Sequence, residues 1–419
     1  MNHGVFRVLA LARPRSPWLA DLTSWSGTGS LEIDLVRCIS CDEVRARLAS
    51  PQRVSAVLLD AEAVGIDRDL LADAREAGTA SIVITVGTVR RDWIELGADL
   101  VLDQLFSRDD LLSSLRSLSS PISTRADLPI IPAPSIAPSA TRCPLIAVTG
   151  SGGSGTSTVA LAIAQHLDGV ALVDAALDAS LALLIGHLDP LPALQEFIEA
   201  HRTGSPGLDE ARRLLHRCER HDLDLLPGLR HHRDWTALQP RAIASALDTL
   251  RNAYRFVVAD VDDDLEGEAE TGSFDIGDRN ALARVITAGA DLIIVTGRPD
   301  LIGMSRQVEI ISRLIHRGIA PPRIIPITLR PIRWALTVAD IRRTVGTLLK
   351  DLHPGMDLVP PTVVELPRDL ELLLLDAAPL PAALVDPLGA VIPAQFAPAT
   401  ASSAELPVLV RPGTLGIAS

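Results

Sequence analysis

One short segment of the sequence combines the residue types that bind phosphate. Its nine residues are Gly150, Ser151, Gly152, Gly153, Ser154, Gly155, Thr156, Ser157 and Thr158. The segment follows an apolar run, Leu145–Val148, and a helical pattern begins within it. Glycines let successive backbone N–H groups point inward, and a helix N-terminus adds partial positive charge. The pattern predicts a nucleotide-binding P-loop in which the Ser157 hydroxyl holds Mg²⁺. The alternative is a glycine-rich strand-to-helix turn that binds no ligand.

The predicted loop contains no lysine, and the whole chain contains only one, Lys350. A lysine contributes charge-assisted contacts of about 1.5–3 kcal/mol, so its loss weakens ATP binding by about 10- to 150-fold. The rate of ATP hydrolysis is reduced further, because a cation that contacts the transferred phosphoryl group accelerates hydrolysis by about 10³–10⁵-fold. Arg142 and Arg298 are candidate substitutes near strand ends, but no pattern directs either toward the loop. We therefore expect weak or absent binding of ATP and Mg²⁺.

Acidic residues end two later apolar runs. Val170–Val173 leads into Asp174, with Asp178 four residues on, and Phe256–Ala259 leads into Asp260. A carboxylate at the end of such a strand holds Mg²⁺ in P-loop proteins. We expect Ser157 and Asp260 to be the Mg²⁺ residues, and Asp174 and Asp178 to be switch residues.

The loop resembles the deviant Walker A motif of the MinD/ParA family, K-G-G-x-G-K-[ST]-T. Ser151 replaces the first, signature lysine and Thr156 replaces the phosphate-gripping one, while Ser157 and Thr158 match the closing hydroxyls. The segment 364–369 resembles the family's late strand at the base end of the nucleotide, whereas Ala176 stands where a second Asp is usual. The order of parts is similar to the branch that contains CpaE, TadZ and septum-site-determining-like proteins.

This resemblance implies two hypotheses about function. The first is a positioning or scaffold protein at a pole, septum or pilus machine, with weak or no ATP hydrolysis. The second is an active ATP-dependent dimerisation switch. Both imply a homodimer with protein partners, in the cytoplasm or recruited to the inner face of the membrane. A third hypothesis is a small-molecule enzyme on a Rossmann-type fold. The sequence contains no set of catalytic residues that supports it.

The elements that must position this site belong to the second of two α/β domains. Residues 1–118 alternate five β-rich runs with helical stretches, which predicts a flavodoxin-like doubly wound sheet. Residues 119–144 are a Pro-rich linker, residues 145–385 a doubly wound, mainly parallel P-loop domain, and residues 386–419 a Pro/Ala-rich tail. Asp60 stands where a receiver domain is phosphorylated, but neither the acidic pair nor the lysine of a working receiver is present. We expect a pseudo-receiver used for dimerisation or docking.

The amino-acid composition and the net charge limit the classes of partner that we expect this chain to bind. The formal net charge of −13 argues against direct binding of nucleic acid. The tail segment 406–412 has two prolines and one charge, which argues against a membrane-binding amphipathic helix, so we expect any membrane recruitment to go through a partner. Cys38 and Cys41 form a C-x-x-C without a second pair, which favours ordinary thiols over a metal or redox site.

Two further groups have structural interpretations. The histidines at 216, 221, 231 and 232 are expected to be solvated side chains at a surface turn. The acidic segment 260–278 is expected to be a solvated loop. Its EF-hand interpretation fails because Ser273 occupies the position of the bidentate Glu.

Overall fold

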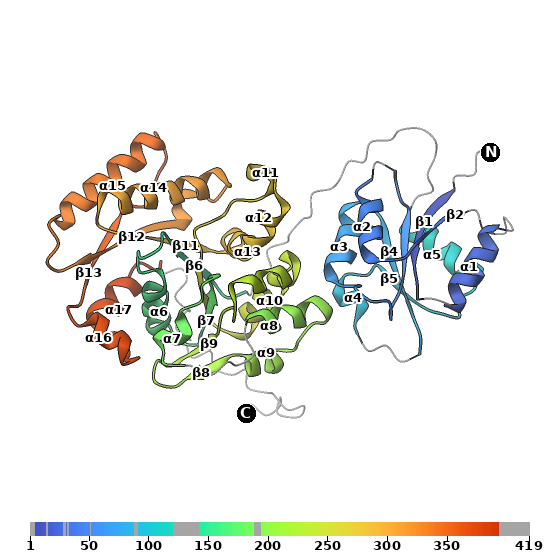
Figure 1. Ribbon diagram of the computed structural model, residues 1–419, viewed down its shortest axis with the longest axis horizontal. Coiled ribbons are helices and arrows are strands. Elements are labelled where there is room, and N and C mark those ends of the chain that lie inside the picture. The colour runs from blue at the N-terminus through green and yellow to red at the C-terminus, as the bar shows by residue number, and fades with distance from the viewer. Residues whose placement is uncertain are drawn as a thin grey trace, which may run out of the picture.

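The structure is a computed structural model, described here for residues 5–13, 16–27, 31, 33–50, 52–87, 91–119, 142–187 and 194–393. Most of the predicted linker, residues 120–141, and most of the predicted tail, residues 394–419, lie outside the described residues. Figure 1 shows two α/β domains side by side.

The N-terminal domain contains a parallel five-stranded sheet of order β2-β1-β3-β4-β5. This is the flavodoxin-like doubly wound order. The strands are β1 (Phe6–Leu11), β2 (Ile33–Cys38), β3 (Ala56–Asp60), β4 (Ala80–Thr85) and β5 (Leu100–Asp103). The helices are α1 (Pro17–Gly27), α2 (Cys41–Leu48), α3 (Arg68–Glu76), α4 (Trp93–Leu96) and α5 (Arg108–Leu118). Strands β3 and β4 are buried along their whole length, as continuous apolar runs predict for central parallel strands.

The second domain contains an eight-stranded sheet of order β13-β12-β11-β6-β10-β7-β9-β8. Its strands are β6 (Leu145–Gly150), β7 (Val170–Ala175), β8 (His216–Cys218), β9 (Leu223–Leu226), β10 (Phe256–Val261), β11 (Leu292–Gly297), β12 (Ile324–Pro331) and β13 (Thr362–Leu366). All pairs are parallel except β8 with β9. The antiparallel edge strand β8 was not predicted, because three residues with a polar centre carry no strand pattern.

Helices cover both faces of this sheet, and each face has its own apolar core. One face carries α8 (Leu194–Thr203), α9 (Leu208–Leu214), α10 (Pro240–Ala253), α13 (Ala281–Gly289), α14 (Leu301–His316) and α15 (Val338–Leu352). The other carries α6 (Thr156–His166), α7 (Leu181–Leu184), α16 (Leu370–Leu375) and α17 (Ala382–Gly389). Two 3₁₀ helices, η1 (His232–Ala237) and η2 (Pro321–Arg323), complete the connections. Packing continues beyond Val385, because Leu388 is fully buried against the second core.

The acidic segment after β10 is not the solvated loop expected from its composition. It forms α11 (Glu268–Thr271) and α12 (Phe274–Arg279). Two of its carboxylates pair with arginines: Asp264 with Arg279, and Glu270 with Arg317. A charge count along the sequence cannot reveal the second pairing, because Arg317 is 47 residues away.

Among the residues described, no helix combines the length and the apolar character needed to cross a membrane.

Candidate nucleotide site

The predicted loop connects β6 to α6 at the carboxyl edge of the sheet, where ligands bind in open α/β folds. Gly153 and Gly155 have φ values of +74° and +84°, which favour glycine. Gly155 is also the N-cap of α6 and provides no side-chain cap. The first N–H groups of α6 are therefore not capped by that residue and can face an anion.

Three hydroxyl groups lie within hydrogen-bonding distance of one another around Thr156, the loop position that a phosphate-gripping lysine would occupy. The Thr296 hydroxyl lies 2.6 Å from the Ser154 hydroxyl and 2.9 Å from the Thr156 hydroxyl, and it also donates to the Thr149 carbonyl at 3.3 Å. Ser154 and Thr156 are 3.2 Å apart. Thr156 thus directs its side chain to a neighbouring strand and supplies no positive charge. The set Ser154, Thr156 and Thr296 is called the hydroxyl triad below.

Asp174 and Asp260 lie opposite each other on the neighbouring strands β7 and β10 and are almost fully buried. Each has one carboxylate oxygen without a hydrogen-bond partner among the described residues. Burial raises the pKa of Asp260 to about 7, with a further rise from Asp174, while a hydrogen bond from Ser157 opposes it. Burial likewise raises the pKa of Asp174 to about 6, against hydrogen bonds from backbone amides.

This donor set fits a magnesium ion. Mg²⁺ prefers oxygen ligands, and the unpartnered oxygens of Asp174 and Asp260 gain from a nearby cation. The Ser157 hydroxyl stands beside Asp260 and also lies 3.0 Å from the Ser180 hydroxyl. Within the described ranges, no group of three or more His, Cys, Asp or Glu side chains could hold a metal. An ion here would therefore need oxygens from hydroxyls, water or phosphate.

The predicted switch residues separate in the structure. Asp174 accepts a hydrogen bond from the Leu181 amide at 2.8 Å and so anchors the start of α7. Asp178 does not join the buried carboxylates, because its side chain is 91% exposed and lies 3.3 Å from the His232 ring. The sequence analysis did not predict the structural role of Asp262, whose carboxylate accepts a hydrogen bond from the Leu177 amide at 2.8 Å.

A cleft of about 280 Å³ adjoins the loop. Its walls include Gly153 and Gly155 from the loop, Trp334 after β12, and Leu366 and Leu370 from the β13 region. The late strand therefore contributes to the wall of the cleft beside the loop.

Arg298 is the cation of this cleft, at the end of β11. Its guanidinium is paired with Asp300 at 2.8 Å. Arg142, the other candidate, pairs with Asp248 at 2.8 Å and is not among the residues that line the cleft. The cleft therefore offers one positive charge that is already partly neutralised.

The candidate phosphosite of the N-terminal domain is closed by its own neighbours. Asp60 is fully buried, and it accepts hydrogen bonds from Ser16 at 2.9 Å and from the Arg13 side chain at 3.2 Å. Burial raises the pKa of Asp60, but bonds from the Glu62 amide, Ser16 and Arg13 outweigh it and hold the pKa below its usual range. Arg13 and Ser16 thus satisfy the Asp60 carboxylate within the domain.

The histidine prediction was wrong for two of its four residues. His216 belongs to β8 and stacks on His187 with ring centroids 3.8 Å apart. His221 is buried and its Nε2 lies 3.2 Å from the Ala377 carbonyl. His231 and His232 are exposed at η1, as expected. Cys38 and Cys41 are both buried, which favours the structural interpretation of these thiols.

Thr296 is the site residue that sequence reasoning missed. It follows the apolar run Leu292–Val295, so its place at a strand end was predictable. Its partnership with the loop depends on β11 lying next to β6, and strand order is not written in a local pattern.

No model of a known protein family matches this sequence, and no curated protein matches it. Solved structures that resemble it include an McdA variant of Cyanothece in complex with ATP (16% identity, 61% of this chain and 96% of that chain, TM-score 0.45). Another is the septum site-determining protein MinD of Pyrococcus horikoshii with Mg-ADP (19% identity, 59% and 91%, TM-score 0.42). A third is a ParA family ATPase of Chlorobium tepidum (14% identity, 60% and 98%, TM-score 0.47). At these identities and TM-scores, the function must be inferred from the site itself.

Proposed function

We propose that this chain is a MinD/ParA-type positioning or scaffold protein that binds ATP weakly and hydrolyses it slowly or not at all. The observation that carries the proposal is the hydroxyl triad. Thr156 stands in the position of the phosphate-gripping lysine and its hydroxyl bonds to Thr296, so the position supplies no charge to a phosphate. The chain's single lysine lies in α15, outside the cleft.

The remaining geometry supports binding more than turnover. The glycine-rich backbone and the start of α6 retain the amide donors that cradle phosphate. Ser157 and Asp260 would hold Mg²⁺, which would neutralise charge between phosphate oxygens when bound. Stabilising the transition state needs a further cation, and Arg298 is bonded to Asp300. Binding without efficient hydrolysis is what these residues favour.

The N-terminal domain fits the same proposal as a pseudo-receiver. Arg13 and Ser16 satisfy Asp60, so a phosphoryl group would have to displace them. We propose that this domain docks to protein partners at a pole, a septum or a pilus machine. Homodimerisation, and recruitment from the cytoplasm to the inner face of the membrane through a partner, are parts of this proposal that rest on the family resemblance.

The alternative is an active ATP-dependent dimerisation switch in cell division, pilus assembly or partitioning. The buried carboxylates favour it, because Asp174 and Asp260 each keep an oxygen free beside Ser157. A cation bound beside these two buried oxygens would satisfy them and compensate the cost of their burial.

Sedimentation velocity with and without nucleotide separates the two hypotheses. The full chain would be measured alone, with Mg-ATP at a millimolar concentration, and with a non-hydrolysable ATP analogue. A scaffold keeps the same oligomeric state in all three samples. A shift from monomer to dimer that appears with both nucleotides, and that reverses with time in ATP but persists with the analogue, would support the switch and reject the scaffold. An Asp260→Asn variant serves as the control for dependence on Mg²⁺.

A further inference from the structure

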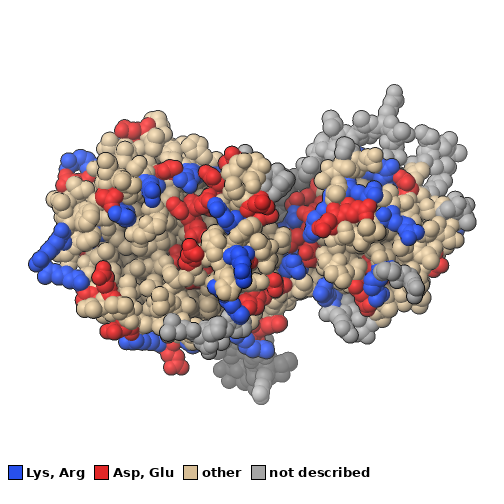
Figure 2. Space-filling view, in the orientation of Figure 1, with Lys and Arg blue, Asp and Glu red and all other residues tan. Residues whose placement is uncertain are grey.

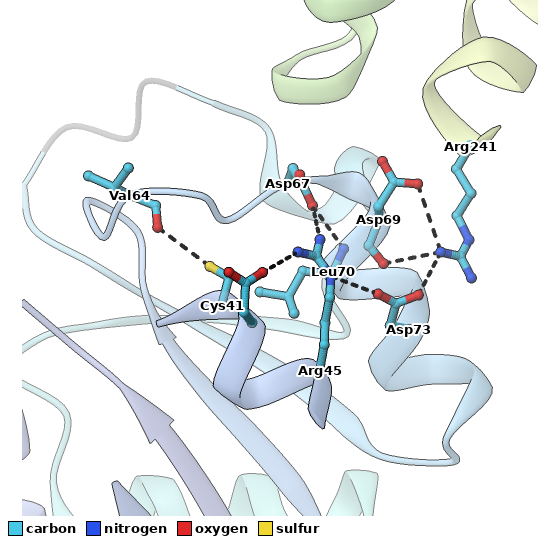
Figure 3. A network of polar contacts seen from close by, with 9 residues as sticks. Cys41, Arg45, Val64, Asp67, Asp69, Leu70, Asp73 and Arg241 are labelled. Atoms are coloured by element: carbon cyan, nitrogen blue, oxygen red, sulfur yellow. Dashed lines mark hydrogen bonds and ion pairs between the residues drawn. The ribbon is translucent and has the colours of Figure 1, made fainter. Parts of the chain in front are cut away.

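The two domains meet through helix α3 of the N-terminal domain and helices α8 and α10 of the P-loop domain. Figure 3 shows Arg241 of α10 reaching the acidic side of α3. Its guanidinium donates to the Asp73 carboxylate at 2.8 Å and to the Asp69 carbonyl at 3.2 Å, and it pairs with Glu76 at 2.6 Å. Asp73 also accepts from Arg45 of its own domain at 3.1 Å, so one carboxylate is shared between the domains.

A second arginine makes contacts in the opposite direction. Arg68, the first residue of α3, donates to the His201 carbonyl at 3.3 Å and to the Ser205 hydroxyl at 3.1 Å. His201 lies in the last turn of α8, where carbonyls lack partners within the helix. Arg68 therefore caps a helix of the other domain, where a cation is favourable.

The charges on the facing helices are unfavourable for each helix alone. Asp69, Asp73 and Glu76 are spaced by four and three residues, so they share one face of α3 and repel one another. Arg241 lies in the first turn of α10, where the helix dipole disfavours a cation. Contact between the two helices offsets both costs. These residues, Asp69, Asp73, Glu76 and Arg241, are called the latch below.

The contact contains no continuous apolar core. Each cluster of buried apolar residues in the described part of the chain lies within a single domain. Asp69 is instead buried at the junction, with one oxygen lacking a hydrogen-bond partner and the other 3.8 Å from Arg241. An interface held by such polar contacts opens more easily than one held by an apolar core.

We propose that the acidic face of α3 is a docking surface whose partner is the basic start of α10, so that the N-terminal domain reversibly covers the α8–α10 face of the P-loop domain. Closing the latch pairs Asp69 with a cation, and opening it exposes both helices to other proteins. Because charge holds the contact, salt opens it.

Small-angle X-ray scattering of the full chain tests the latch. At about 0.05 M salt we expect a compact particle, and at about 0.5 M salt a larger radius of gyration. Arg241→Ala and, separately, Arg68→Ala should expand the particle already at low salt, with the ratio of open to closed molecules rising at least about tenfold. Asp69→Asn added to Arg241→Ala should recover part of the compaction, because it removes the unpaired buried charge.

Arg343→Ala is the matched control, since it removes an exposed arginine of α15 that pairs only with Asp340 among the described residues. It should leave the scattering unchanged. Amide exchange of β3 and β10 reports whether each domain remains folded in every variant. Three results would overturn the proposal. One is an unchanged radius of gyration in folded Arg241→Ala and Arg68→Ala, and another is an equal increase in Arg343→Ala. The third is a failure of Asp69→Asn to recover compaction in the Arg241→Ala background.

Discussion

At the scale of single residues, the site differs from a working P-loop in one side chain more than in any other. The Thr156 hydroxyl is hydrogen-bonded within the hydroxyl triad, and α6 begins at Thr156 without a side-chain cap from Gly155. A positive charge restored at this position should find a prepared cradle. A substitution at this one position therefore tests whether the loop is a phosphate site.

Thr156→Lys should strengthen binding of a fluorescent ATP analogue by about 10- to 150-fold, the worth of charge-assisted contacts to phosphate. Thr347→Lys is the matched control, because it adds the same charge on the exposed side of α15. Equal affinities in the two variants would show that the loop is not a phosphate site. Fluorescence titration in the presence of Mg²⁺ gives both values.

Asp60 provides a residue-scale prediction about pH. Its folded pKa lies below the ordinary value of 3.8, so its stabilising contribution is fully present above that value and disappears as the pH falls through the folded pKa. Asp60→Asn should therefore destabilise the N-terminal domain by about 1–3 kcal/mol at pH 7 and by less near pH 3.

Amide exchange of β1 and β3 measures this difference. The control is Asp34→Asn, which alters an exposed pair with Arg7 in the same domain. A loss for Asp60→Asn that is equally large at both pH values would contradict the role given to the carboxylate.

At the scale of elements, the loop is shaped by strands that lie beside it as well as by its own glycines. The Leu329 side chain of β12 leaves no room for a side chain at Gly155. A Cβ added at Gly155 would lie 2.5 Å from the Leu329 side chain. The left-handed φ of Gly155 adds a second obstacle to any other residue there. Strand β12 therefore fixes the start of α6.

Gly155→Ala should lower the free energy of unfolding of the P-loop domain by at least about 1–2 kcal/mol, the cost of the left-handed conformation alone. Gly152→Ala is the control in the same loop, because an added Cβ there meets no atom within 4 Å. Urea unfolding followed by the amide exchange of β6 and β10 compares the two. Equal stability of both variants would contradict the account of the loop.

The sequence predicted the strands that end at the candidate site, because buried runs such as Phe256–Ala259 carry their own pattern. It missed the role of Thr296 and the pairing of Glu270 with Arg317, since both depend on elements far apart in the chain. Local pattern predicts elements and strand ends, while long-range contacts decide which side chains meet.

At the scale of the whole molecule, the charge distribution limits the partners. Figure 2 shows acidic and basic side chains mixed over the face in view, without a broad basic surface. With a net charge of −13, the chain should not shift a DNA duplex in a gel at about 0.15 M salt and about 10 µM protein. A shift that disappears at higher salt would contradict this expectation and favour the partitioning form of the alternative function.

Equilibrium titration of the full chain with ATP and Mg²⁺, with phosphate release followed in the same samples, tests the central claim most directly. We expect weak binding, with half-saturation well above about 10 µM, and no measurable turnover, because the cradle is present and the cation is missing. Saturation below about 10 µM together with steady phosphate release would contradict the account and establish the chain as an ATP-driven switch.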